Sequence, residues 1–110
     1  VAARIWAEAA EALLQGGAPP LEAVVLCEHG LDLNSGDAAC VLLSGLALER
    51  AGLLDHAIVR MEAAALAKGD LEMWQRDLLE RALQRLHESA RAVAAGCSDT
   101  VLHAIHVLGS

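Results

Sequence analysis

Phenylalanine and tyrosine are absent from this sequence, and its 110 residues include only two tryptophans and two prolines. The hydrophobic fraction still reaches 55%, and alanine and leucine supply most of it. These two residues are strong helix formers, and few residues in the chain would interrupt a helix. The composition therefore predicts an all-α fold, and the length predicts a single domain over 1-110.

Basic residues are also scarce, with 8 Lys and Arg against 15 Asp and Glu, for a net charge of −7. Without a basic patch or an aromatic platform, we expect no nucleic-acid binding. The same charge argues against binding to a membrane surface. No apolar run reaches the roughly 18–20 residues that span a bilayer, and we expect no signal-like segment. The apolar excess suggests a protein partner instead.

Catalytic motifs are missing as well. There is no glycine-rich phosphate loop, and Ser44 lacks a Gly-x-Ser-x-Gly context. Cys27 stands beside His29 in "CEH", but it occupies an apolar helical position and is predicted to lie in the core. The three cysteines are an odd set without paired spacing, which is typical of reduced cytosolic thiols. We expect neither an enzyme nor a cofactor.

One candidate metal site remains as an alternative. His103 and His106 share a helix face in "HAIH", and Cys97 precedes them. Two histidines at this spacing form half of a zinc site, but no further ligand follows at helical spacing. We therefore expect no metal, and a small metalloenzyme is the competing hypothesis.

Helical segments and short turns account for the sequence. "QGGAPP" and "LNSGD" separate the first three predicted helices, and Asp37 or Ser35 is a candidate N-cap for the third. Gly52 marks a tight turn, and Gly69 ends a fourth helix near Lys68, with Asp70 as the next N-cap. The pattern from 71 to 95 is unbroken until Gly96, and a last helix is predicted over 98–108.

The segment from Gly45 to Asp70 fits the 34-residue tetratricopeptide pattern of paired helices. Gly45 and Ala57 are the small residues where two helices cross, which explains a glycine in mid-helix despite its cost of about 1 kcal/mol. The predicted units cover 2-35 and 36-69, and a long capping helix and a final helix fill 70-110. An ordinary antiparallel helical bundle is the alternative. The predicted packing residues are Gly45, Gly52, Ala23, Ala57, Met61 and Trp74.

In this repeat class the first helix of each pair lines a concave groove. The groove lacks the Lys and Asn that hold a peptide carboxylate, and its apolar floor and acidic rim suit an amphipathic helix. The alternative is that the chain's own long C-terminal helix covers Leu42 and Leu46. The predicted partner-binding residues are Ile5, Ala12, Leu42, Leu46, Glu49, Leu79 and Leu83, joined at neighbouring positions by Glu8, Gln15 and Ala39.

The order of these motifs resembles the tetratricopeptide-type chaperones of the needle subunit in bacterial type III secretion. The matching features are Glu22 and Ala23 at a helix start, a Gly36-Asp37 turn, Gly52 before Ala57 and Ile58, "LEMW" from Leu71 to Trp74, and Ser98-Asp99 before the last helix. They span nearly the whole chain. The glycines that break the family's third unit are absent here.

The resemblance implies a cytoplasmic bacterial chaperone. It would hold the amphipathic C-terminal helix of the needle subunit in its groove, act with a small helical co-chaperone, and prevent premature polymerisation. The alternatives are a generic tetratricopeptide interaction module and a translocator-type secretion chaperone.

Overall fold

A computed structural model describes the backbone of residues 2–109 and the side chains of residues 3–92. All regular structure in this part of the chain is helical, which confirms the predicted all-α class. No helix in it is both long enough and apolar enough to cross a bilayer. The elements are α1 (Ala2–Gln15), α2 (Pro20–Leu33), α3 (Ala38–Arg50), α4 (Leu54–Leu66), the 3-10 turn η1 (Lys68–Asp70) and α5 (Met73–Gly109).

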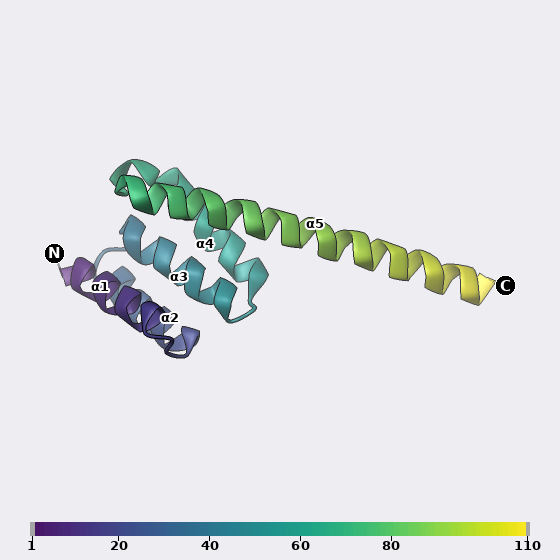
Figure 1. Cartoon of the computed structure of the whole chain (residues 1–110), viewed down its shortest axis with the longest axis horizontal. Helices are drawn as coiled ribbons and strands as arrows, with labels where there is room; N and C mark the ends of the chain where they lie inside the picture. The colour runs from purple at the N-terminus through teal and green to yellow at the C-terminus, as the bar shows by residue number, and fades with distance from the viewer. Residues whose placement is uncertain (1, 110) are drawn as a thin grey trace.

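The first four helices form two antiparallel hairpins, α1–α2 and α3–α4, and α5 lies along the second hairpin (Figure 1). Helix α3 is central, because it contacts α1, α2, α4 and α5. Its residues from Leu42 to Leu48 are all buried, so α3 has no solvent face along this run. The C-terminal part of α5 projects away from the other helices (Figure 1).

Helix boundaries follow local chemistry. Pro20 opens α2, where its missing N–H leaves no helical bond unmade. Asp37 caps α3, because its Oδ1 accepts a 2.8 Å hydrogen bond from the backbone N of Cys40. Gly17 and Gly52 have φ values of 75° and 82° in the two hairpin turns. These left-handed conformations suit glycine, and each lets the next residue bond back to a carbonyl of the preceding helix.

Two boundaries differ from those expected. Helix α5 begins at Met73 and not after an Asp70 cap, because buried Leu71 adopts an extended conformation to reach the core. The backbone N of Glu72 then donates to Gln75 Oε1 at 2.9 Å. Helix α5 also continues through Gly96 instead of ending there. One glycine costs about 1 kcal/mol relative to alanine, which is too little to end this long helix, in which two alanines directly precede Gly96.

Residues 34 positions apart occupy matching buried places in the two hairpins. Leu14 and Leu48, Ala23 and Ala57, and Cys27 and Met61 are all in the core. The same spacing relates the buried pair Ala10 and Ser44, and the buried pair Gly30 and Ala64. Each pair holds the same position on the first or second helix of its hairpin, so the two hairpins bury the same faces.

Two glycines allow close helix contact. At Gly45 a Cβ would lie 3.1 Å from Met61 Sδ and Cε, so α3 and α4 approach closely there. At Gly30 a Cβ would lie 2.5 Å from Cys40 Sγ and 3.1 Å from Trp6 Cβ. Gly30 therefore brings α2 against both α1 and α3, a role that the sequence did not indicate.

Candidate functional site

An open cavity of about 450 Å³ lies beside the N-terminal ends of α1, α3 and α5. We call its lining the N-terminal groove. It takes residues from α1, from the α2–α3 turn, from the start of α3, and from the segment that leads into α5. The lining residues are Arg4, Ala7, Glu8, Glu11, Asn34, Gly36, Asp37, Ala38, Ala39, Leu43, Asp70, Glu72, Trp74 and Gln75.

The first turns of the three helices meet at this cavity. Arg4, Ala38 and Glu72 each line it, and successive members of this set are 34 residues apart in the sequence. Residues that are far apart in sequence but related by this 34-residue interval therefore line the same cavity. The repeat spacing, from which Glu8 and Ala39 were also predicted as groove positions, is the sequence signal that pointed to this cavity.

Most of the predicted groove floor lies elsewhere. Leu42 is 1% exposed, and Leu46 and Leu79 are also buried in the core. Leu83 packs against the core from a partly buried position. In this chain these leucines do not form an open apolar floor. Leu42 and Leu46 lie on α3, which is enclosed by its neighbours, α5 among them, and Leu79 and Leu83 on α5 pack against the core.

The remaining predicted groove residues divide into three groups. Glu8 and Ala39 line the cavity. Ile5, which is 64% exposed, and exposed Ala12 and Gln15 lie on α1 outside its lining. Glu49 is engaged within the chain, since its carboxylate pairs with Arg85 on α5.

The packing residues expected from the repeat pattern are mostly internal. Ala23, Ala57, Met61 and Gly45 are buried, and Gly52 forms the exposed turn between α3 and α4. Trp74 is the exception, because it is 48% exposed and lines the cavity. Its indole Nε1 donates a 2.6 Å hydrogen bond to Glu72 Oε2, which fixes the ring at the edge of the groove.

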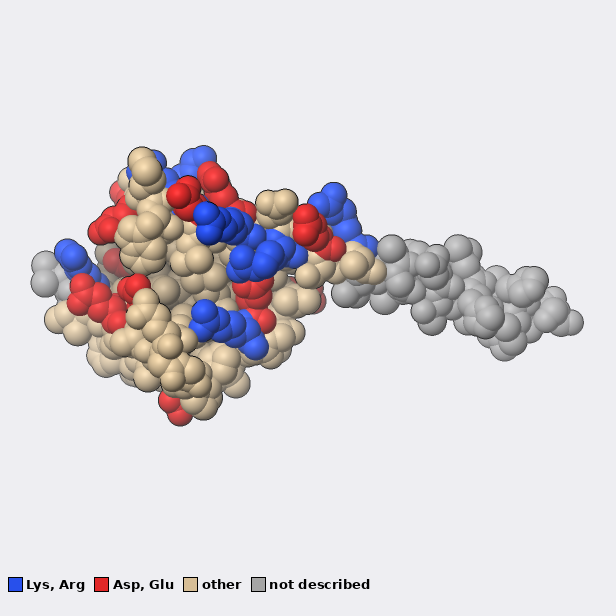
Figure 2. All heavy atoms as spheres, in the orientation of Figure 1, with Lys and Arg blue, Asp and Glu red and all other residues tan. Residues whose placement is uncertain are grey.

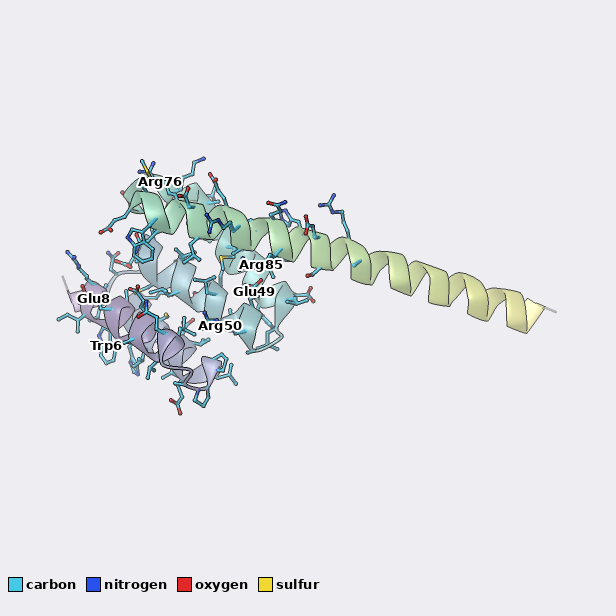
Figure 3. The ribbon with its side chains drawn as sticks, viewed as in Figure 1. Trp6, Glu8, Glu49, Arg50, Arg76 and Arg85 are labelled. Atoms are coloured by element: carbon cyan, nitrogen blue, oxygen red, sulfur yellow. The ribbon has the colours of Figure 1, made fainter. Side chains whose placement is uncertain are left out.

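Acidic and basic side chains are distributed unevenly over the surface seen in Figure 2. Acidic atoms gather near the N-terminal end, and a group of basic atoms lies toward the middle of the view (Figure 2). Figure 3 labels Arg50 and Arg85 in that basic region, with Glu49 between α3 and α5. Arg85 Nη2 is 2.9 Å from Glu49 Oε1, and this hydrogen bond raises the pKa of Arg85.

Arg50 on α3 binds the C-terminal end of α1, away from the cavity. Its Nη1 donates a 2.8 Å hydrogen bond to the carbonyl O of Leu14, near the C-terminus of α1. This carbonyl also accepts a longer, 3.4 Å hydrogen bond from the backbone N of Gly17, and the cation opposes the negative end of the helix dipole. Arg50 thus links α3 to α1, and Arg85 links α5 to α3.

No protein-family model matches this chain, and no curated protein or solved structure matches it significantly. Function must therefore be inferred from the residues and their geometry.

The cysteines described by the structure have no exposed sulfur. Cys27 and Cys40 are both fully buried. Burial raises the pKa of each thiol to about 12, so neither forms a thiolate near neutral pH. Cys27 is therefore a core residue and not a nucleophile paired with His29, whose ring stacks on Trp6 at a centroid distance of 4.9 Å.

Within residues 3–92, no three His, Cys, Asp or Glu side chains converge as a metal site would require. The alternative set of Cys97, His103 and His106 lies outside the described side chains. The groove itself offers an open surface of carboxylates, small apolar residues and one indole, an arrangement suited to binding a peptide segment.

Proposed function

We propose that this chain is a tetratricopeptide-like chaperone that binds a helical segment of another protein in the N-terminal groove. On this proposal the two hairpins are successive repeats, and the start of α5 is the first helix of a third. The matching burial of residues 34 positions apart supports this, as does the shared lining by Arg4, Ala38 and Glu72. A bundle with a chance period has no reason to repeat its buried positions.

The observation that carries the proposal is the open cavity of about 450 Å³ beside α1, α3 and α5. First helices of stacked repeats line the concave surface of a solenoid, and solenoid proteins bind their partners on this extended surface. The lining of the cavity has no activated nucleophile, so binding and not catalysis is the proposed activity.

The partner that we propose is the one implied by the resemblance in the sequence. We propose that the segment is the amphipathic C-terminal helix of a type III secretion needle subunit, held in a bacterial cytoplasm. A needle subunit assembles through apolar helix faces, so covering one face blocks polymerisation without any chemical step. The proposed contact surface is the N-terminal groove and not the leucines predicted as its floor, because Leu42, Leu46 and Leu79 are buried and Leu83 packs against the core.

A second partner surface is available on α2. Leu21, Val25 and Leu33 are exposed and fall on one helical face, since they are spaced by four and eight residues. His29 lies between them and stacks on Trp6. We propose that the small helical co-chaperone covers this face, because a stripe of exposed apolar residues favours association.

Co-expression tests the proposal directly. The chain is expressed with the needle subunit and the small co-chaperone encoded beside it, and the complex is isolated by size exclusion. We expect a soluble heterocomplex in which the needle subunit stays unpolymerised. A chain that purifies alone and captures neither protein contradicts the proposal. Capture of a translocator protein in their place supports the translocator-type alternative.

The co-chaperone surface has its own test. Val25→Glu places a charge in the middle of the exposed face of α2, where the side chain has solvent around it. We expect the variant to fold, to lose the co-chaperone, and to keep the N-terminal groove intact. Val59→Glu on α4 is the matched control, because Val59 is similarly exposed but lies on another helix.

A further inference from the structure

The N-terminal groove has a strongly acidic lining. It contains a single basic side chain, that of Arg4, and five carboxylates, those of Glu8, Glu11, Asp37, Asp70 and Glu72. A surface of this kind repels acidic segments and attracts basic ones, which governs both the choice of partner and the rate of encounter. The partner segment therefore has to bring positive charge to this end of the groove.

Contacts within the chain leave much of this negative charge unneutralised. Arg4 Nε lies 3.2 Å from Glu8 Oε1, so the one cation pairs with one carboxylate. Asp37 and Glu72 accept hydrogen bonds from a backbone N–H and from an indole N–H, which are neutral donors. Glu11 accepts only from the Gln15 amide, at 3.3 Å. Neutral donors orient these carboxylates without cancelling their charge.

Trp74 adds a second kind of complementarity. Its ring is half-exposed in the cavity lining, and the bond to Glu72 holds it in place. A cation over an indole face is attracted by the ring quadrupole, by about 0.5–1 kcal/mol when exposed and about 2 kcal/mol when desolvated. A buried packing tryptophan would not present this face.

Apolar residues complete the lining. Ala7, Ala38, Ala39 and Leu43 form a wall beside the carboxylates. Lysine and arginine bury their methylene stems on such a wall while the charged end reaches a polar region. We propose that the groove receives a lysine or arginine side chain of a basic amphipathic helical segment, its cation lying between the Trp74 ring and the carboxylates. This inference rests on the proposed function, since it takes the groove to hold a helix.

A pair of model peptides tests this charge preference. One has leucines on one helical face and lysines on the other, and its counterpart has glutamates in place of the lysines. Fluorescence anisotropy of each labelled peptide is measured with the full chain. We expect the Leu/Lys peptide to bind at least about tenfold more tightly, a difference of about 1.4 kcal/mol. Equal affinity for the two peptides overturns the inference.

Matched variants distinguish binding in the groove from the long-range attraction of any acidic protein for a basic peptide. Trp74→Leu removes the ring, and we expect it to weaken Leu/Lys binding by about 3- to 30-fold. Trp6→Leu is its control, because Trp6 lies outside the groove lining. We expect that control to leave the affinity within about twofold, and an equal loss in the two variants counts against the inference.

The carboxylates have a control of the same net charge. Glu11→Gln with Asp70→Asn neutralises two lining residues, whereas Glu22→Gln with Asp55→Asn neutralises two exposed residues outside the groove. We expect the groove pair to weaken Leu/Lys binding by at least about threefold more than the control pair. Equal weakening shows that only the long-range field attracts the peptide, which contradicts a specific site.

The same variants distinguish this inference from the proposed function. If wild-type chain captures its needle subunit and Trp74→Leu and the groove pair capture it equally well, the function stands and the charged groove is wrong. If no needle subunit is captured but the Leu/Lys peptide behaves as expected, the groove inference stands and the chaperone proposal fails.

Discussion

Replacing Gly45 with alanine tests the close contact between α3 and α4. An added Cβ would lie 3.1 Å from both Met61 Sδ and Met61 Cε, and 3.2 Å from Met61 Cγ. Met61 is 0% exposed, so its side chain cannot move into solvent to relieve the contact. All three close atoms belong to Met61, so a second substitution that shortens this side chain should remove the steric conflict.

Two opposing terms set the magnitude. Gly→Ala in a helix interior favours the helix by about 1 kcal/mol. Overpacking a buried contact costs about 1–3 kcal/mol. In the wild-type chain we therefore expect Gly45→Ala to lower the free energy of unfolding by about 0–2 kcal/mol. In a Met61→Ala background the contact is gone, and we expect the same change to stabilise by about 1 kcal/mol.

Urea unfolding followed by far-UV circular dichroism measures all four chains of this cycle, and the coupling energy should be about 1–3 kcal/mol. Gly69→Ala is the control, because no atom lies within 4 Å of its added Cβ. Its effect should not depend on Met61. Met61→Ala alone should cost about 2–5 kcal/mol. If this leaves too little folded protein, the stability of the Gly45→Ala single variant is the test. A gain of about 1 kcal/mol from Gly45→Ala in the wild-type chain refutes the close-packing argument.

Three further expectations follow from other contacts. Gly30→Ala places a Cβ 2.5 Å from Cys40 Sγ, so it should destabilise more than Gly45→Ala in urea unfolding, and Cys40→Ala should restore part of the loss. Asp37→Ala removes the cap of α3 and should cost about 0.5–2 kcal/mol in the same assay, with Asp37→Asn losing little. Burial raises the pKa of the Cys27 and Cys40 thiols from 9.0 to about 12. Their contribution to stability should therefore be complete below pH 9 and decline as the pH rises toward 12, which pH-dependent urea midpoints check against a chain with both cysteines replaced by alanine.

Local features of the sequence predicted most helix boundaries. Pro20, Asp37 and Gly52 act within a few residues of themselves, through a fixed φ, a side-chain cap and a left-handed turn. Two boundaries of α5 differed from the prediction: one depends on a distant contact, and the other on the small helix-breaking energy of a single glycine. Leu71 reaches the core and delays the start of α5, and Gly96 alone is too weak a breaker to end it.

The candidate site was harder to foresee. A helical period tells which residues share a face, but not which neighbour covers that face. Leu42 and Leu46 share the face assigned to the groove, yet both are buried. The sequence predicted an acidic rim, but not which carboxylates form it, because Glu11, Asp37 and Asp70 are far apart in sequence and meet only through the packing of the helices.

The amino-acid sequence by itself determined the helical class, the short turns between helices and the small residues at helix crossings, because propensity, capping and periodicity act over a few residues. Only the tertiary structure decided that α3 is enclosed by four helices, that Gly30 is a contact point, and that the open surface is an acidic groove edged by Trp74. These properties depend on contacts between different helices, such as those that bring Arg4, Ala38 and Glu72 to one cavity, and solvent exposure is set by that arrangement.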